Sequence, residues 1–259
     1  MAALSPFLSY YVDLDGTRVR VSGLRGPANY LWMLPEQHTL VIVGCSGSLS
    51  LAGMPETVEN VIIIESSGLT DLHGLPPNLE FLEITRCLQL QSLAGLPQGL
   101  ESLAIEGCFR LRWEPDYLPE GLKQLVLIDQ RATDSFEAIP RSVVTLNLVR
   151  LPAVRSLDGL PEGLRSLTLR NLPEVSDLSV LPENLDYLSI TDCLKVEAAP
   201  FRPSLTRFYS SQDYLVYMPD GQDVIPDHPV HDSKSYHELI SGYMAHLENR
   251  KKRPSIYAD

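Results

Sequence analysis

The stretch LPPNLEFLEITRCLQLQSLAG, Leu75 to Gly95, decides the fold, because variants of it follow one another along most of the chain. Its apolar-Pro start recurs in steps of 20 to 22 residues. The starts lie at Leu34, Met54, Leu75, Leu96, Leu118, Ile139, Leu160 and Leu181, with a degenerate ninth at Phe201. A fixed period of this length indicates a solenoid, in which neighbouring units bury one another's apolar side chains.

The consensus of the units is L-P-x-x-L-x-x-L-x-L-x-x-C-x-x-L-x-x-L-x-G. Its L-x-x-L-x-L segment alternates, so that Leu82 and Ile84 face inward and Glu83 faces outward, which predicts one short parallel strand per unit. So short a unit leaves too little chain for a long helix, and we expect extended or 3₁₀ segments on the convex side. The consensus resembles the leucine-rich repeat, which implies a horseshoe solenoid with its parallel β-sheet on the concave face.

The pattern divides the chain into three parts. Residues 1–33 are an expected N-terminal cap, in which Tyr10 to Leu14 and Thr17 to Val21 pair as a β-hairpin across Asp15-Gly16, a favoured two-residue turn. Residues 34–212 hold eight full repeats and the degenerate ninth. Residues 213–259 hold a capping loop, an amphipathic α-helix and a basic tail.

The helix is predicted over residues 235–250. Ser235 and Glu238 make a capping box at its start. Apolar residues recur at helical spacing on one face: Tyr236, Leu239, Ile240, Tyr243, Met244 and Leu247. Two questions stay open: whether this helix caps the solenoid or binds a partner, and whether Arg250 to Arg253 form a nuclear-import signal.

The net charge of −12 belongs to the repeats, since Leu34 to Pro200 carry 23 acidic and 11 basic residues. So acidic a solenoid argues against binding a nucleic-acid backbone and is compatible with a basic protein partner. The chain contains no apolar run of 18 residues, so we expect no membrane span. The N-terminal stretch lacks the features of a cleaved secretory signal, and we expect a cytoplasmic protein.

All four cysteines share one phase of the repeat, here called the ladder position: Cys45, Cys87, Cys108 and Cys193. This placement predicts reduced, buried packing residues. Zinc sites use paired spacings such as C-x₂-C, which the chain lacks. A reactive cysteine needs an accessible, electropositive setting, which the ladder position does not offer.

Two motifs suggest catalytic or metal-binding chemistry, but the sequence around each of them favours a structural role. Asp13-Leu14-Asp15-Gly16-Thr17 resembles the D-x-D-G-T signature of haloacid-dehalogenase-type phosphotransferases, which casts Asp13 as nucleophile and Asp15 as acid/base. A second strand pattern follows instead of a βαβ unit, so we expect a hairpin turn. His228, His231 and His237 have metal-ligand spacing but fit exposed polar positions. We expect no enzyme, no cofactor and no metal.

The outward strand positions form the expected interaction face. Early units offer apolar and acidic residues, later ones Arg and Tyr, which are the usual anchors of protein interfaces. Ile62, Ile64 and Phe81 are expected side by side as an exposed apolar patch. The predicted partner-binding residues on the concave face are Glu59, Ile62, Ile64, Phe81, Glu83, Glu106, Val126, Arg150, Arg165, Arg170, Tyr187, Arg207 and Tyr209.

The repeats LPEGLRSLTL (Leu160 to Leu169) and LPENLDYLSI (Leu181 to Ile190) resemble the leucine-rich-repeat effectors of bacterial type III secretion, the YopM and IpaH group. That group usually has Asn where this chain has Cys, and its IpaH-like members add a ubiquitin-ligase domain for which no segment here has room. The Cys-bearing units are also similar to the repeats of plant NLR immune receptors, without their nucleotide-binding domain.

These observations predict a non-enzymatic scaffold that binds a protein partner. The effector resemblance implies a host protein as that partner and delivery into the cytoplasm or nucleus of a host cell. Two alternatives stay open: an endogenous cytoplasmic adaptor, and an accessory that recruits substrates to a ubiquitin ligase or kinase.

Overall fold

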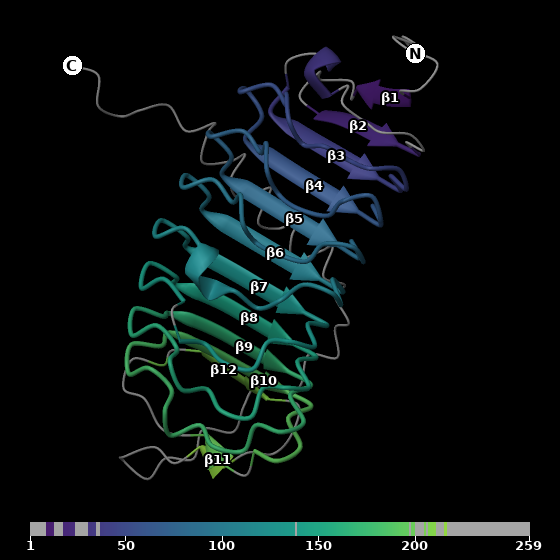
Figure 1. Cartoon of the computed structure of the whole chain (residues 1–259). Helices are drawn as coiled ribbons and strands as arrows, with labels where there is room; N and C mark the ends of the chain where they lie inside the picture. The colour runs from purple at the N-terminus through teal and green to yellow at the C-terminus, as the bar shows by residue number, and fades with distance from the viewer. Residues whose placement is uncertain are drawn as a thin grey trace, which may run out of the picture. The chain divides into compact units, whose positions relative to one another are not determined.

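The computed structural model describes residues 9–12, 18–23, 31–34, 37–137, 139–196, 198–199, 205, 207–210 and 215–216. One 11-stranded sheet runs through them (Figure 1). Its strands, in order across the sheet, are β1 (Ser9–Val12), β2 (Arg18–Ser22), β3 (Thr39–Val43), β4 (Asn60–Ile64), β5 (Phe81–Thr85), β6 (Ser102–Glu106), β7 (Gln124–Ile128), β8 (Thr145–Val149), β9 (Ser166–Arg170), β10 (Tyr187–Thr191) and β12 (Arg207–Ser210). A separate pair joins β11 (Ala198–Ala199) to β13 (Leu215–Val216) in parallel.

From β2 onward every strand of the large sheet pairs in parallel with its neighbours, and equivalent repeat positions face one another. Leu82 on β5, for example, pairs with Val61 on β4 and with Leu103 on β6. The predicted period therefore becomes one strand per repeat, and the chain forms a parallel β-sheet solenoid.

The first two strands pair antiparallel, with Tyr10 opposite Val21 and Val12 opposite Val19. This is the register that the predicted hairpin requires. Its turn at Asp15-Gly16 lies outside the described residues, and its capping role stays a prediction. The helix expected over 235–250 and the basic tail also lie outside them.

The inward side chains of all the described repeats join one continuous core, which extends from Val19 to Val196. Leu82 and Ile84 are fully buried in it, as the alternation predicts. Leu90 and Leu93 complete the unit from the turns behind the strand. No unit closes this core alone, because each layer of leucines is covered by the layers on either side.

The segments between strands are turns, as the repeat length predicts. The amide of Leu79 donates to the carbonyl of Pro76 (3.2 Å), and that of Leu90 to the carbonyl of Cys87 (3.2 Å). The described residues contain no α-helix; two 3₁₀ helices are present, η1 (Leu31–Met33) and η2 (Pro115–Tyr117). Within the described part of the chain, neither helical segment has the length or apolar character of a membrane crossing.

The consensus glycine allows repeats to stack closely. Gly95 has φ of +99°, and a Cβ at this position would lie 2.8 Å from the backbone nitrogen of His73 and 2.8 Å from the carbonyl carbon of Leu72. Both the left-handed conformation and the close approach exclude a side chain at this turn.

After most strands the ladder position supplies a hydrogen-bond donor under the turn, whereas after β8 and β9 it holds Leu151 and Leu172. The thiols of Cys87 and Cys108 point to carbonyls two residues earlier, those of Thr85 (3.7 Å) and Glu106 (3.6 Å). Gln130 stands at the same position in its repeat, and its Nε2 donates to the carbonyl of Ile128 (2.9 Å). The four cysteines are free and buried.

Candidate interaction face

The side chains that point away from the core form one face of the sheet, called here the outer sheet face. The parallel register aligns them in three rows that cross the strands. On β5 the three positions are Phe81, Glu83 and Thr85. Each row therefore presents one side chain per strand, about 4.8 Å from the next.

The structure brings most of the predicted partner-binding residues onto this face. Those on its strands are Ile62 and Ile64 (β4), Phe81 and Glu83 (β5), Glu106 (β6), Val126 (β7), Arg170 (β9) and Tyr187 (β10). Arg207 and Tyr209 belong to β12. Glu59 and Arg165 come directly before β4 and β9, at the N-terminal ends of the strands. Arg150 comes directly after β8, at the C-terminal ends. The side chains of β12 lie outside the description.

The expected exposed patch of Ile62, Ile64 and Phe81 is wrong for Phe81. This side chain is only 1% exposed, whereas both isoleucines are half-buried. Alternation along a strand predicts which way a side chain points but not how exposed it is. The prediction of an exposed Phe81 was wrong for this reason.

Phe81 belongs to a group of outer-face side chains on β5–β7 that are all buried, called here the central patch. The group consists of Phe81, Glu83, Thr85, Ser102, Ala104, Val126 and Ile128. None of its apolar members belongs to the core cluster of inward side chains. Their burial therefore arises on the outer sheet face.

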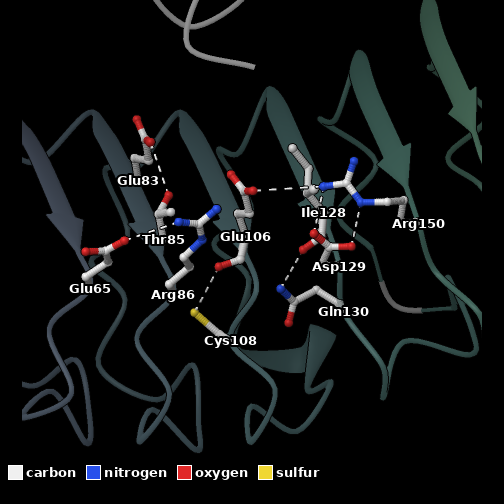
Figure 2. A network of polar contacts seen from close by, with 10 residues as sticks. All are labelled: Glu65, Glu83, Thr85, Arg86, Glu106, Cys108, Ile128, Asp129, Gln130 and Arg150. Carbon is white, nitrogen blue, oxygen red and sulfur yellow. Dashed lines mark hydrogen bonds and ion pairs between the residues drawn. The ribbon is translucent and has the colours of Figure 1, made fainter. Parts of the chain in front are cut away.

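Glu83 places a carboxylate inside the central patch. It is 3% exposed, and Thr85 Oγ1 donates to its Oε1 at 3.3 Å (Figure 2). A buried carboxylate is costly unless hydrogen-bond donors or cations surround it. The patch thus combines an apolar surface with one buried carboxylate.

Charged side chains lie along the C-terminal ends of the parallel strands, called here the C-terminal edge of the sheet (Figure 2). Arg150 binds Asp129 in a bidentate pair, Nε to Oδ1 at 2.6 Å and Nη2 to Oδ2 at 2.7 Å, and lies 3.9 Å from Glu106. The hydrogen bonds that Arg150 donates to Asp129 raise the pKa of Arg150. Arg86 Nη1 pairs with Glu65 Oε1 at 3.2 Å one repeat away.

This edge is built from residues in the left-handed conformation, a feature that the sequence analysis missed. Each comes directly before a ladder position, and the non-glycine members have φ of 50–55°: Glu65, Arg86, Asp129, Arg150, Asn171 and Asp192. Their amides continue the sheet ladder, as when Arg150 donates to the carbonyl of Arg170 at 2.9 Å. That bond offsets the strain of about 1–2 kcal/mol per residue. Gly44 and Gly107 at the equivalent positions were the available signal.

The arginines toward the C-terminal end of the sheet differ in their pairing. Arg165 Nη1 lies 3.7 Å from Asp186 Oδ1. Arg170 is exposed and makes no ion pair with any of the described residues. Within the described part of the chain, Arg170 therefore offers an unneutralised charge at the end of β9, where it pairs with Thr191 on β10.

Two kinds of chemistry, metal binding and thiol reactivity, can be judged for the described residues. They contain no group of three or more His, Cys, Asp or Glu side chains that could hold a metal ion. Burial raises the pKa of Cys87 to about 11 and that of Cys108 to about 12, so neither thiol is a thiolate at neutral pH. Asp13 and Asp15, and His228, His231 and His237, lie outside the described residues.

No family model and no curated protein matches this chain. Among solved structures, it is similar to a leucine-rich-repeat protein of T. pallidum, with 13% identity over 76% of this chain and 91% of that one, at a TM-score of 0.29. It is also similar to a leucine-rich cell-surface protein of Faecalibacterium prausnitzii, with 11% identity over 80% of this chain and 84% of that one, at a TM-score of 0.18. At such TM-scores the solenoid rests on the chain's own repeats and strand register.

Proposed function

We propose that the chain is a non-enzymatic scaffold that binds a protein partner on its outer sheet face. The observation that carries the proposal is that this face changes from apolar and acidic side chains near β4 to basic side chains near β9. Half-buried Ile62 and Ile64 lie on β4, which Glu59 precedes, whereas exposed Arg165 precedes β9 and exposed Arg170 ends it. Apolar side chains ringed by charge, with Arg and Tyr as anchors, are what protein interfaces use.

The same gradient specifies the partner's charge pattern. A complementary partner presents basic groups toward Glu59 and Glu106 and an acidic group toward Arg170. Oppositely charged surfaces of this kind orient the partner and speed its association. Because Arg170 has no ion partner among the described residues, truncating it removes an attraction without freeing a buried charge within that part of the chain.

We further propose that the partner is a host protein and that the chain acts as a bacterial effector in the cytoplasm or nucleus of a host cell. Support comes from the resemblance of repeats such as LPEGLRSLTL, residues 160–169, to type III secreted effectors. An adaptor in the chain's own cell, or a substrate-recruiting accessory of a ubiquitin ligase or kinase, would use the same face.

The test is affinity capture from eukaryotic and from bacterial lysates with identification of the retained proteins. Ile62→Ser/Arg170→Ala changes the outer sheet face. The matched control, Val180→Ser/Arg155→Ala, makes comparable changes at exposed turn positions.

A eukaryotic protein that the unchanged chain and the control retain, and that the outer-face variant loses at least tenfold, supports the proposal. Equal retention by all three proteins refutes binding on this face. A specific partner found only in bacterial lysate overturns the effector role and leaves the adaptor.

A further inference from the structure

A row of mostly apolar side chains follows the C-terminal edge of the sheet. Its members come directly after the ladder position in successive repeats and are called here the edge row: Leu88, Phe109, Arg131, Pro152, Pro173 and Leu194. Leu88, Phe109 and Leu194 are 44%, 48% and 74% exposed. One member per strand, at about 4.8 Å per step, makes a row of about 24 Å from end to end. Exposed apolar side chains gathered in this way mark interaction sites.

A hollow of about 380 Å³ opens between the edge row and the residues that come directly before the ladder position. Its walls are Phe109, Arg131, Pro152 and Pro173 from the edge row, and Asp129, Arg150 and Asn171 from the left-handed positions. Figure 2 shows two of these, Asp129 and Arg150, side by side at the C-terminal edge. Ligand pockets in proteins measure about 300–1,000 Å³, so the hollow has the size of a small binding site.

Arg131 brings a positively charged group to this hollow. Its Cζ lies 4.6 Å from the centroid of the Phe109 ring, which is a cation–π distance. This contact holds the guanidinium against the wall and uses none of its five N–H donors. Arg131 is exposed, and within the described part of the chain it makes no hydrogen bond and no ion pair. Among the described residues, therefore, nothing competes with a ligand for these donors.

The charge of the hollow matches one carboxylate. Arg131, Arg150 and Asp129 line it, which leaves a net charge of +1 in a chain of net charge −12. A carboxylate carries one negative charge, whereas a phosphate monoester carries about −1.5 to −2 at pH 7 and exceeds this balance. The side chain of Asn171, which makes no hydrogen bond within the described part of the chain, adds a neutral donor.

We propose that the hollow binds the carboxylate of an aspartate or glutamate side chain of a protein partner, and that the residues around that side chain lie along the edge row. The carboxylate accepts charge-assisted hydrogen bonds from Arg131, and the two prolines pack against the apolar part of the same residue. Leu88 and Leu194 extend the row past both ends of the hollow, so the segment runs through the site and does not end in it. At about 3.3 Å per extended residue, a row of about 24 Å accommodates about seven residues.

The test is a titration of the full chain, labelled with ¹⁵N, by the end-blocked peptide acetyl-Leu-Thr-Leu-Asp-Leu-Thr-Leu-amide. A second peptide with asparagine in place of aspartate has the same shape without the charge. Nuclear magnetic resonance follows the Nε–H signals of the arginine side chains, and Arg131→Gln identifies the Arg131 signal by its loss. We expect the aspartate peptide to shift this signal saturably and to bind at least tenfold more tightly than the asparagine peptide.

Substitutions in the chain locate the site. Arg131→Gln should weaken binding of the aspartate peptide at least tenfold, because it removes the charge and the guanidinium donors. The matched control is Arg141→Gln, which removes the same charge from an exposed position in the turn that leads into β8. That turn lies about one strand length, about 17 Å, from the hollow, which exceeds the Debye length of about 8 Å at physiological salt. The control should therefore change the affinity less than twofold.

Three outcomes overturn the proposal. Equal affinity for the two peptides, or no saturable shift with either, means that the hollow does not bind a carboxylate. Affinity that survives Arg131→Gln places the carboxylate elsewhere. A phosphoserine version of the peptide that binds tenfold more tightly than the aspartate peptide assigns the hollow to phosphate.

This proposal does not depend on binding at the outer sheet face. Ile62→Ser, on β4, should weaken capture on that face and leave the affinity for the aspartate peptide unchanged. Arg131→Gln should weaken the peptide and leave Ile62 and its surroundings as they are. The two proposals can therefore fail separately.

Discussion

Substituting Gly95 with alanine tests how closely the repeats approach one another. The new Cβ would lie 2.8 Å from the amide nitrogen of His73 and 2.8 Å from the carbonyl carbon of Leu72, and both are backbone atoms. Backbone cannot rotate aside as the end of a long side chain can. The turn must therefore move away from the preceding repeat and take with it the leucines that it positions.

The magnitude follows from two separable contributions. Holding alanine at φ of +99° costs about 1–3 kcal/mol. Overlap in a closely packed region adds about 1–3 kcal/mol. We therefore expect Gly95→Ala to lower the free energy of unfolding by about 2–6 kcal/mol.

Two other glycines separate these contributions. Gly44 has φ of +66° and nothing within 4 Å of its missing Cβ, so Gly44→Ala should cost only the conformational strain, about 1–2 kcal/mol. Gly121 has neither a positive φ nor an overlap, its nearest neighbour being the Gln98 carbonyl oxygen at 3.7 Å. Gly121→Ala should be neutral or stabilise by up to about 1 kcal/mol through the unfolded chain.

The assay is urea unfolding followed by far-ultraviolet circular dichroism, with all three variants compared at one protein concentration. The expected order of midpoints is Gly121→Ala, then Gly44→Ala, then Gly95→Ala. If Gly95→Ala unfolds at the same urea concentration as Gly44→Ala, the backbone overlap is absent and the reasoning about close stacking is refuted.

Three further predictions concern the core, the edge and the thiols. Leu82→Ala should cost about 2–5 kcal/mol of unfolding free energy, and Ile62→Ser on the outer sheet face less than that; equal losses would contradict the assigned faces. Asp129→Asn should cost under about 1 kcal/mol, because its pair with Arg150 is partly exposed, and salt near 1 M should remove the difference. Because burial raises the pKa of Cys108 to about 12, from an ordinary 9, the folded state holds this proton more tightly than the unfolded state. Stability is therefore complete below pH 9 and is lost as the pH rises toward 12, by up to about 1.4 kcal/mol per pH unit. Cys108→Ala should show a shallower decline of the unfolding midpoint above pH 9, and parallel curves would contradict burial of the thiol.

The sequence predicted the strands because their physics is periodic. Each unit must bury leucines at the same positions, so the positions of Leu82 and Ile84 fix the strand and its register with both neighbours. The same periodicity predicts that the four cysteines lie in the core, and all four are buried. The antiparallel pairing of Tyr10 with Val21 also followed from local turn chemistry.

The rest depends on contacts that no single repeat encodes. The left-handed conformation of Arg86 and Asp129 is held by amide bonds to the next strand, so charged residues stand where sequence rules favour glycine. Phe81 is buried on the outer sheet face, and the alternation of its own strand does not report this burial. Gln130 replaces cysteine under its turn because a longer amide reaches the same carbonyl.

Because equivalent positions face one another from β2 to β10, the distance between two outer-face side chains is set by the number of strands between them. Each repeat contributes one strand, so duplicating residues 75–95 would lengthen the array by one step of about 4.8 Å and leave the pairing on either side unchanged. A partner that contacts Glu59 and Arg170 together would then find its second contact displaced by that step. The number of repeats, as much as the identity of any side chain, thus sets which partners fit this surface.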